Sequence, residues 1–163
     1  MKLIALGSNL PSPLGGPVQN LQSALAQIWS LGWGITAKSY LYESAPVPVS
    51  DQPWFVNGVV AVTSEDAPAV ALEKLLRIEN DMGRVRSQKN AARIVDLDIL
   101  AWDDCRMDGD IALPHPRMHV RAFVLYPLCD IAHHWRHPTL GETAMQMRDA
   151  LPPSDIRVAK EQW

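Results

Sequence analysis

The stretch Phe55-Val56-Asn57-Gly58-Val59-Val60-Ala61-Val62-Thr63 is strongly β-prone, because valine and phenylalanine favour extended backbone. Successive side chains of a strand point to opposite faces. One face of this strand therefore carries Val56, Val60 and Val62, and the other carries Phe55, Asn57 and Val59. The stretch predicts a strand that has apolar side chains on both faces.

Further helices and strands are expected on both sides of this strand. Before it, the apolar patterns predict a strand over 2–7, a helix over 17–30, a strand over 35–42 and then a proline-rich loop over 43–53. After it, they predict a helix between 66 and 83, a polar loop over 84–92 and a strand over 95–102. Helical segments are expected over 117–131 and 142–151, and the tail 152–163 is expected to be loosely ordered.

The resulting order, β-α-β-β-α-β, is that of a ferredoxin-like split βαβ domain. We therefore predict an α+β fold in which helices pack on an antiparallel sheet. The chain of 163 residues has the length of one domain, so we expect residues 1–163 to form a single domain. Because this fold hosts many unrelated functions, the function has to be argued from the site.

The composition is that of a globular protein without a strong net charge. The 15 Lys and Arg residues against 18 Asp and Glu residues give a net charge of −3, which argues against a dedicated nucleic-acid-binding protein. No apolar run approaches the roughly 18–20 residues that span a bilayer, and the first apolar stretch is too short for a signal peptide. Cys105 and Cys129 are expected as free thiols. We therefore expect a cytoplasmic protein that binds neither nucleic acid nor membrane.

The small net charge hides a basic block that runs directly into an acidic block. Residues 74–93 hold six basic and two acidic residues, a local charge of +4. Residues 94–110 hold six acidic residues and one basic residue, a local charge of −5. The boundary between the two blocks is the place where a site for a charged ligand is expected.

Asp96 and Asp98 lie in the predicted strand over 95–102, so their side chains share one face. Two carboxylates this close repel each other, and aspartate is rare in strands. Mg²⁺ would remove the repulsion, since it binds one or two carboxylates together with phosphate oxygens of a substrate. The alternative is that both aspartates line the solvated outer face of an edge strand.

Four cations precede the two aspartates, namely Arg84, Arg86 and Lys89 in the predicted loop and Arg93 directly after it. Arginine presents a planar fork to phosphate oxygens, and cations beside Mg²⁺-binding carboxylates are typical of phosphoryl-transfer sites. A solvated charged loop and a nucleic-acid patch are the alternatives. The second is weakened because the adjoining aspartates would repel a polyanion.

Aromatic and histidine side chains give weaker signals. Phe55 and Asn57 share a strand face, where they could stack on a flat heteroaromatic ligand and hydrogen-bond to its edge. A core phenylalanine and a turn asparagine are the commoner alternatives, and a core role is also the commoner one for Phe123. His115 lies between two prolines and suits a phosphate contact or proton transfer better than a zinc site.

Several of these motifs occur together, in this order, in the 6-hydroxymethyl-7,8-dihydropterin pyrophosphokinase family of folate biosynthesis, which the chain resembles over most of its length. The resemblance is strongest over 89–100, which fits the family pattern of a basic residue, two small residues, arginine and D-x-D. The other matching segments are 6–9, 42–46, 52–57, 83–86, 113–117 and 121–123, together with Glu79.

The resemblance implies transfer of pyrophosphate from ATP, the co-substrate, to the hydroxymethyl group of the pterin, with release of AMP. It implies that Asp96 and Asp98 bind two Mg²⁺ ions and that they are catalytic together with Arg84 and Arg93. The implied ATP-binding residues are Glu79, Arg84, Arg93, His115 and Arg121. The implied pterin-binding residues are Phe55, Phe123 and Asn57, with the backbone of Ser44, Pro46 and Val47. A monomer that acts on small-molecule substrates is expected.

The loop before Arg93 departs from the family pattern. Many members carry an aromatic residue after the basic position of this loop, whereas Asn90 follows Lys89 here, and the loop is slightly shorter. The hypothesis that follows is a looser lid, which would affect product release more than chemistry. Two alternatives to an active enzyme stay open: a ligand-binding module without turnover and an RNA-binding ferredoxin-like domain, which the D-x-D pair disfavours.

Overall fold

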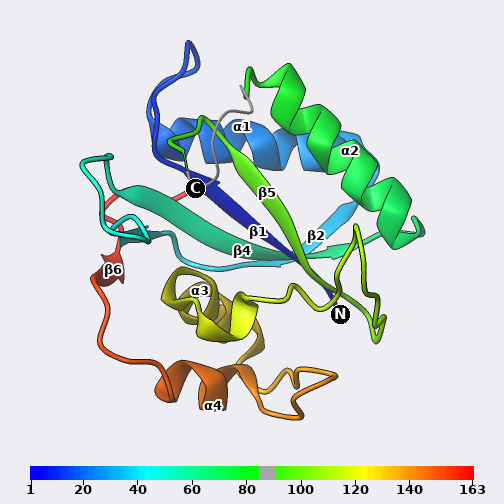
Figure 1. Cartoon of the computed structure of the whole chain (residues 1–163). Coiled ribbons are helices and arrows are strands. Elements are labelled where there is room, and N and C mark those ends of the chain that lie inside the picture. Colours follow the sequence, from blue (N-terminus) through cyan, green and yellow to red (C-terminus); the bar gives the residue numbers. More distant parts are fainter. Residues whose placement is uncertain (85–90) are drawn as a thin grey trace.

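The computed structural model describes residues 1–84 and 91–163 of the chain. Within these ranges, one six-stranded sheet lies between two layers of helices (Figure 1). The strands are β1 (Lys2–Ser8), β2 (Gly34–Lys38), β3 (Tyr42–Ser44), β4 (Phe55–Thr63), β5 (Asp96–Trp102) and β6 (Ile156–Val158). The helices are α1 (Pro17–Ser30), α2 (Pro68–Asp81), α3 (Ala122–Ala132) and α4 (Ala144–Asp149), with a short 3-10 helix over Met118–Val120.

The sheet has the strand order β5-β1-β4-β3-β6, and β2 also pairs with β4. All pairings in the described part of the chain are antiparallel. The succession β1-α1-β2-β4-α2-β5, with β4 paired between β1 and β2, is a split βαβ arrangement. The predicted α+β fold, with helices packed on an antiparallel sheet, is therefore confirmed.

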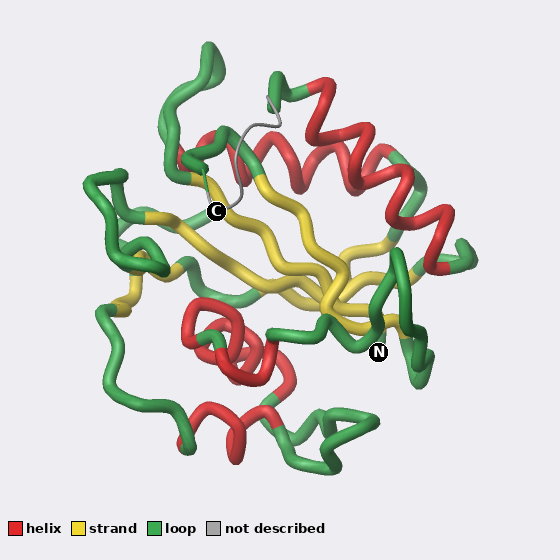
Figure 2. Tube along the Cα trace, in the orientation of Figure 1, coloured by secondary structure: helices red, strands yellow, loops and turns green. Residues whose placement is uncertain are grey.

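Both faces of β4 are covered, as its alternating apolar side chains predict. Val56, Val60 and Val62 belong to the core on the side of α1 and α2. Val59 and Ala61 belong to the core on the side of α3 and α4. Figure 2 shows the helices (red) on both sides of the sheet (yellow). Full burial of a valine side chain contributes about 1.5–3 kcal/mol, so these two cores account for much of the stability of the fold.

The single strand predicted over 35–42 is wrong, because two strands replace it. β2 ends at Lys38 and β3 begins at Tyr42. Ser39 accounts for the interruption, because its hydroxyl accepts a hydrogen bond from the amide of Val59 at 3.0 Å and so takes the place of a backbone carbonyl. Since β3 continues to Ser44, the long loop begins at Ala45 rather than at the predicted position 43.

The helices differ less from the predictions. α1 and α2 occupy the predicted segments 17–30 and 66–83, and α4 lies within 142–151. The single segment predicted over 117–131 is divided, because Arg121 has extended backbone between the 3-10 helix and α3. No helix in residues 1–84 or 91–163 is long and apolar enough to cross a membrane.

The tail was expected to be loosely ordered over 152–163, and this expectation is wrong. Residues Ile156–Val158 form β6, which pairs with β3, and the amide of Ala159 donates to the carbonyl of Leu41 at 2.8 Å. The indole of Trp163 donates to the carbonyl of Ser39 at 2.8 Å. The polar sequence of the tail gives no sign of this pairing, because the pairing depends on the free edge of β3, which lies far away in the sequence.

The tail packs closely on Gly58 in the middle of β4. A Cβ atom at this position would lie 2.6 Å from Cη2 of Trp163 and 2.9 Å from Cδ2 of Leu41. Such distances are too short for carbon atoms in contact, which approach to about 3.5–4.0 Å. The glycine therefore provides the space that the indole ring occupies.

We expect Gly58→Ala and Trp163→Ala each to lower the free energy of unfolding by about 2 kcal/mol, the first by overpacking and the second by leaving a cavity. The double variant should lose clearly less than the sum, because removal of the ring makes room for the new methyl group. Urea unfolding of the four proteins measures these values. Strictly additive losses would show that the contact between positions 58 and 163 is unimportant.

Candidate functional site

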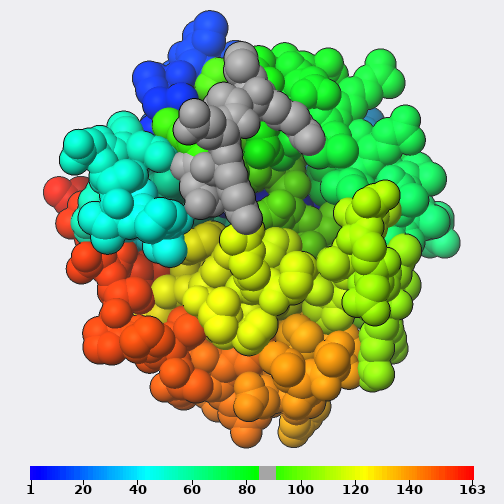
Figure 3. Space-filling model, viewed as in Figure 1, coloured from blue at the N-terminus to red at the C-terminus, as the bar shows by residue number. Residues whose placement is uncertain are grey.

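A cavity of about 810 Å³ opens on the face of the sheet that α3 covers only in part. Side chains and backbone from β1, β3, β4, β5, α2 and the start of α3 line it. Figure 3 shows this face of the molecule, on which the cyan, green and yellow parts of the chain that contribute to the cavity are all visible. The residues that the resemblance assigned to the site all lie in its wall: Ser44, Pro46, Val47, Phe55, Asn57, Glu79, Arg84, Arg93, Asp96, Asp98, His115, Arg121 and Phe123.

The register of the sheet explains why the polar side chains meet there. On β5, Asp96 pairs with Gly7 and Asp98 pairs with Ala5 of β1, and Gly7 in turn pairs with Asn57 of β4. Paired residues in a sheet point to the same face, so the two aspartates and Asn57 face the cavity together. Gly7 leaves the space between them open, since a Cβ atom there would lie 3.2 Å from Oδ1 of Asn57.

Asp96 is held between two arginines. Its Oδ1 accepts a hydrogen bond from Nη1 of Arg84, and its Oδ2 accepts one from Nη1 of Arg93, each at 2.7 Å. Arg93 is held again at its Nε, which donates to the carbonyl of Ala91 at 3.0 Å. The carboxylate and the two guanidinium groups therefore form a fixed charged row along one wall of the cavity.

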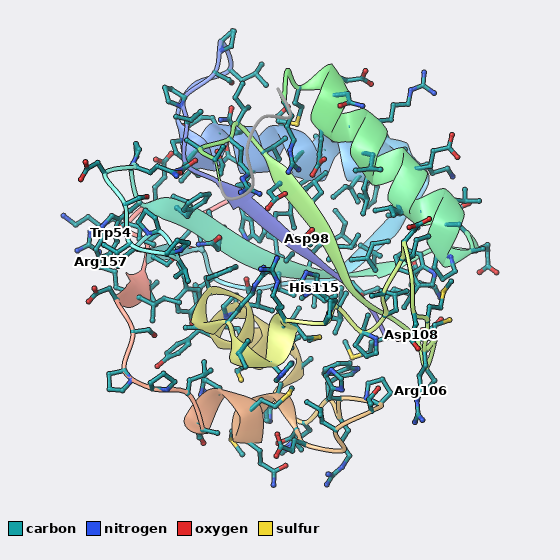
Figure 4. All side chains as sticks on the ribbon, in the orientation of Figure 1. Trp54, Asp98, Arg106, Asp108, His115 and Arg157 are labelled. Atoms are coloured by element: carbon teal, nitrogen blue, oxygen red, sulfur yellow. The ribbon has the colours of Figure 1, made fainter. Side chains whose placement is uncertain are left out.

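Asp98 is the more accessible of the two aspartates. Its side chain is 42 % exposed, and its Oδ2 lies 3.9 Å from Nη1 of Arg121 and 4.0 Å from Nε2 of His115. Figure 4 shows Asp98 and His115 directed toward one another. The cavity wall removes water from around Asp98, and Asp96 adds a like charge, so the pKa of Asp98 rises to about 6. A cation would relieve both effects.

His115 presents a neutral ring with a defined donor. Its Nδ1 accepts the amide of Arg117 at 3.1 Å, so the proton of the neutral ring is on Nε2, the atom nearest to Asp98. Burial and the neighbouring Arg121 and Arg117 lower the pKa of His115 to about 4. The ring therefore stays neutral at physiological pH and can donate a hydrogen bond into the cavity.

Glu79 on α2 supports this row from behind. Its side chain is buried, and its Oε1 accepts the amide of Leu97 at 2.7 Å and pairs with Nη1 of Arg84. Burial raises the pKa of Glu79 to about 7, with smaller contributions from Asp96 and Asp98 and an opposing effect of Arg84. Glu79 thus orients Arg84 toward Asp96, in addition to forming part of the cavity wall.

Asn9 is a buried residue of this region for which sequence reasoning assigned no role. Its Oδ1 accepts the amide of Arg93 at 2.8 Å, and its Nδ2 donates to the carbonyl of Pro53 at 3.1 Å. It therefore joins the segment before β5 to the loop before β4. In the sequence, Asn9 lies directly after β1, in a stretch that matches the family pattern over 6–9 and also resembles an ordinary turn.

Aromatic side chains occupy the other part of the cavity. Phe55 and Phe123 both line it, and the guanidinium carbons of Arg93 and Arg121 lie 5.9 and 5.4 Å from their ring centres. The Nδ2 of buried Asn57 donates to the hydroxyl of Ser44 at 2.9 Å, which fixes the amide. Of the other sequence predictions, Arg86, Lys89 and Asn90 lie outside the described residues.

Together, the fold and the cavity define a ferredoxin-like domain with an open small-molecule site, in which arginines lie beside two carboxylates and next to two phenylalanines. The model of the 7,8-dihydro-6-hydroxymethylpterin-pyrophosphokinase (HPPK) family matches residues 3–133. The chain belongs to this family.

Relatives of two lengths match the chain. The 2-amino-4-hydroxy-6-hydroxymethyldihydropteridine pyrophosphokinase of Pseudomonas aeruginosa is 42 % identical over 83 % of this chain and 82 % of the relative. The folic acid synthesis protein FOL1 of Dictyostelium discoideum is 37 % identical over 91 % of the chain, which spans only 22 % of that protein. A crystal structure of a Plasmodium falciparum HPPK-DHPS triple mutant with STZ-DHP superposes with a TM-score of 0.72 at 17 % identity, over 91 % of this chain and 42 % of that one.

Glu79 gives a pH-dependent prediction. Its pKa is about 7 in the folded state against 4.5 as the ordinary value, so the folded protein binds more protons between these pH values and loses stability as the pH rises through them. We expect Glu79→Gln to remove this loss, which is on the order of 3 kcal/mol. Chemical unfolding of both proteins from pH 4.5 to 8 measures it, and equal slopes would contradict the assignment.

Proposed function

We propose that this chain transfers pyrophosphate from ATP to the hydroxymethyl group of 6-hydroxymethyl-7,8-dihydropterin and releases AMP, as a step of folate synthesis. The observation that carries the proposal is the continuity of one cavity from the arginine-flanked aspartates to the two phenylalanines and Asn57. This arrangement suits a triphosphate at one end and a flat heteroaromatic ring at the other. Membership of the HPPK family and the name of the Pseudomonas relative support the same reaction.

The reaction is a displacement at phosphorus. The hydroxymethyl oxygen forms a bond to the β-phosphorus of ATP, the bond from that phosphorus to the oxygen bridging to the α-phosphate breaks, and AMP leaves with the bridging oxygen. The chain contributes position and charge, and no covalent intermediate with the protein is needed. Arg84, Arg93 and Arg121 would bind phosphate oxygens, and Nε2–H of His115 would donate to one.

Asp98 is the better candidate to accept the hydroxyl proton. Both oxygens of Asp96 already accept hydrogen bonds from arginines, whereas Oδ2 of Asp98 lies 3.9 Å from Nη1 of Arg121 and 4.0 Å from Nε2 of His115. Asp96, held between Arg84 and Arg93, would instead keep the two cations in place.

The donor set also fits two Mg²⁺ ions. Asp96 and Asp98 present carboxylate oxygens to one cavity, and each oxygen of Asp96 has a second lone pair beside the one that an arginine uses. When bound, Mg²⁺ would neutralise charge on the triphosphate. The chain supplies only two carboxylates here, which matches Mg²⁺ sites that are completed by substrate phosphates and water.

The pterin ring would stack between Phe55 and Phe123, with its polar edge toward Asn57. The hydrogen bond from Nδ2 of Asn57 to Ser44 leaves Oδ1 and the second amide proton of Asn57 for the ligand. The backbone of Ser44, Pro46 and Val47 lies in the same wall. Stacking on aromatic rings and a fixed amide select a flat ring with both donors and acceptors.

We infer further that residues 1–163 act as one domain, since both cores share one sheet. A monomer in the cytoplasm, acting on small molecules and not on nucleic acid, is the proposed state. The net charge of −3 supports the proposal that nucleic acid is not a ligand, and the free thiols of Cys105 and Cys129 support a reducing compartment.

Asp98→Ala should reduce AMP formation from ATP, Mg²⁺ and the dihydropterin by at least about a hundredfold, because it removes a metal ligand and proton acceptor. Asp108→Asn is the matched control, since Asp108 is exposed in the acidic turn far from the cavity (Figure 4), and it should retain full activity. Both variants should fold. Near-normal turnover by Asp98→Ala would refute the metal assignment, and ADP as product would refute pyrophosphate transfer.

A metal chelator added in excess should stop AMP formation by the wild-type chain, and an excess of Mg²⁺ should restore it fully, because the two carboxylates can no longer approach the triphosphate without cations. The same chelator saturated with Mg²⁺ beforehand serves as the control and should have no effect. Full AMP formation in the presence of metal-free chelator would exclude the proposed Mg²⁺ dependence.

A further inference from the structure

Arg157 lies on β6, outside residues 3–133 that the family model matches. Its guanidinium group contacts two side chains of the β3–β4 region. Nε donates a hydrogen bond to Oε2 of Glu43 at 2.7 Å, and Nη2 forms an ion pair with the same oxygen at 2.6 Å. The guanidinium carbon lies 4.9 Å from the ring centre of Trp54. Figure 4 shows Trp54 and Arg157 next to each other at the edge of the molecule.

These contacts join the two ends of one loop. Glu43 is the second-last residue of β3, which ends where the loop 45–54 begins, and Trp54 is the last residue of the loop before β4. The residues beside them, Ser44 and Phe55, line the main cavity, as do Pro46 and Val47 within the loop. Arg157 therefore holds together the base of the loop that carries the proposed pterin-binding residues.

Backbone contacts support the same junction. Arg157 pairs with Glu43 in the sheet register, and the amide of Ala45 donates to the carbonyl of Asp155 at 3.1 Å. The segment 151–156 also forms one wall of a second cavity of about 420 Å³, which shares Ser44, Pro46, Val47 and Phe123 with the main one. The C-terminal segment thus lies directly behind the proposed pterin site.

We propose that Arg157 is a positioning residue that fixes the loop 45–54 for pterin binding without touching the ligand. This inference rests on the proposed function. The side chain of Arg157 is 68 % exposed, and exposed ion pairs and cation–π contacts contribute little to global stability. Their loss therefore acts on the conformation of the loop, and so on pterin affinity, more than on the stability of the whole fold.

Arg157→Ala should raise both the Kd and the KM for the dihydropterin by about three- to tenfold, the size expected for one exposed pair and one cation–π contact. The KM for ATP should change less than about twofold, because the charged row around Asp96 is untouched.

Arg157→Lys keeps the charge and loses the planar stacking, so its Kd and KM for the dihydropterin should lie between those of the wild type and those of Arg157→Ala. Trp54→Leu should raise the Kd and KM for the dihydropterin by a similar factor. The double variant of Trp54→Leu and Arg157→Ala should show little further rise.

Arg148→Ala is the matched control. Arg148 also pairs with a carboxylate, that of Asp149, and lies 6.0 Å from the ring centre of Tyr126, but it has no described contact with the loop 45–54. Arg148→Ala should shift Tm about as much as Arg157→Ala does. It should leave the Kd and KM for the dihydropterin and the KM for ATP unchanged. Calorimetry gives Kd, AMP formation gives KM, and thermal unfolding gives Tm.

Two results would overturn the inference. The first is equal pterin affinity in the Arg157→Ala and Arg148→Ala variants. The second is a parallel rise of the KM for the dihydropterin and the KM for ATP in Arg157→Ala together with a large fall in Tm, which would indicate a merely structural role. A wild-type chain that binds the dihydropterin without forming AMP would overturn the proposed reaction, and the comparison of Kd values would still decide the role of Arg157. A wild-type chain that does not bind the dihydropterin at all would overturn both.

Discussion

Alternation along β5 is the constraint on which the site depends. A strand presents every second side chain to a given face, so Asp96 and Asp98 face the cavity while Leu97 and Ile99 enter the core beside α1 and α2. The same apolar side chains that fix the strand in the sheet thereby hold two carboxylates in a position that like charges would otherwise avoid. The arginines on either side of Asp96 make this arrangement tolerable before any ligand binds.

The larger elements were predictable from local patterns. The apolar alternation over 55–63, the helical periodicities of α1 and α2 and the strand over 95–102 each depend on side chains close together in sequence. The order of these elements was sufficient for the ferredoxin-like fold. The residues of the cavity were found through charge and through the resemblance of short motifs, and the register of β1, β4 and β5 brings them together.

Long-range contacts were not predictable. The hydroxyl of Ser39 interrupts a strand by replacing a carbonyl toward β4, and the polar tail pairs with β3, whose free edge no local pattern reveals. The role of Asn9 depends on two partners far from it in the sequence. Glu79 was predicted at the nucleotide, and its burial behind Arg84 becomes visible only once α2 is placed against the edge of β5.

The outer edge of β5 has a consequence beyond the site. An edge strand with free amides and carbonyls is a template for pairing with another chain and hence for aggregation. Here the amide of Leu97 donates to Glu79 and the carbonyl of Leu100 accepts the amide of His115 at 2.8 Å. Two residues of the candidate site thus also occupy pairing positions of this edge. Substitutions that alter the local backbone there would affect the solubility of the protein as well as its ligand binding.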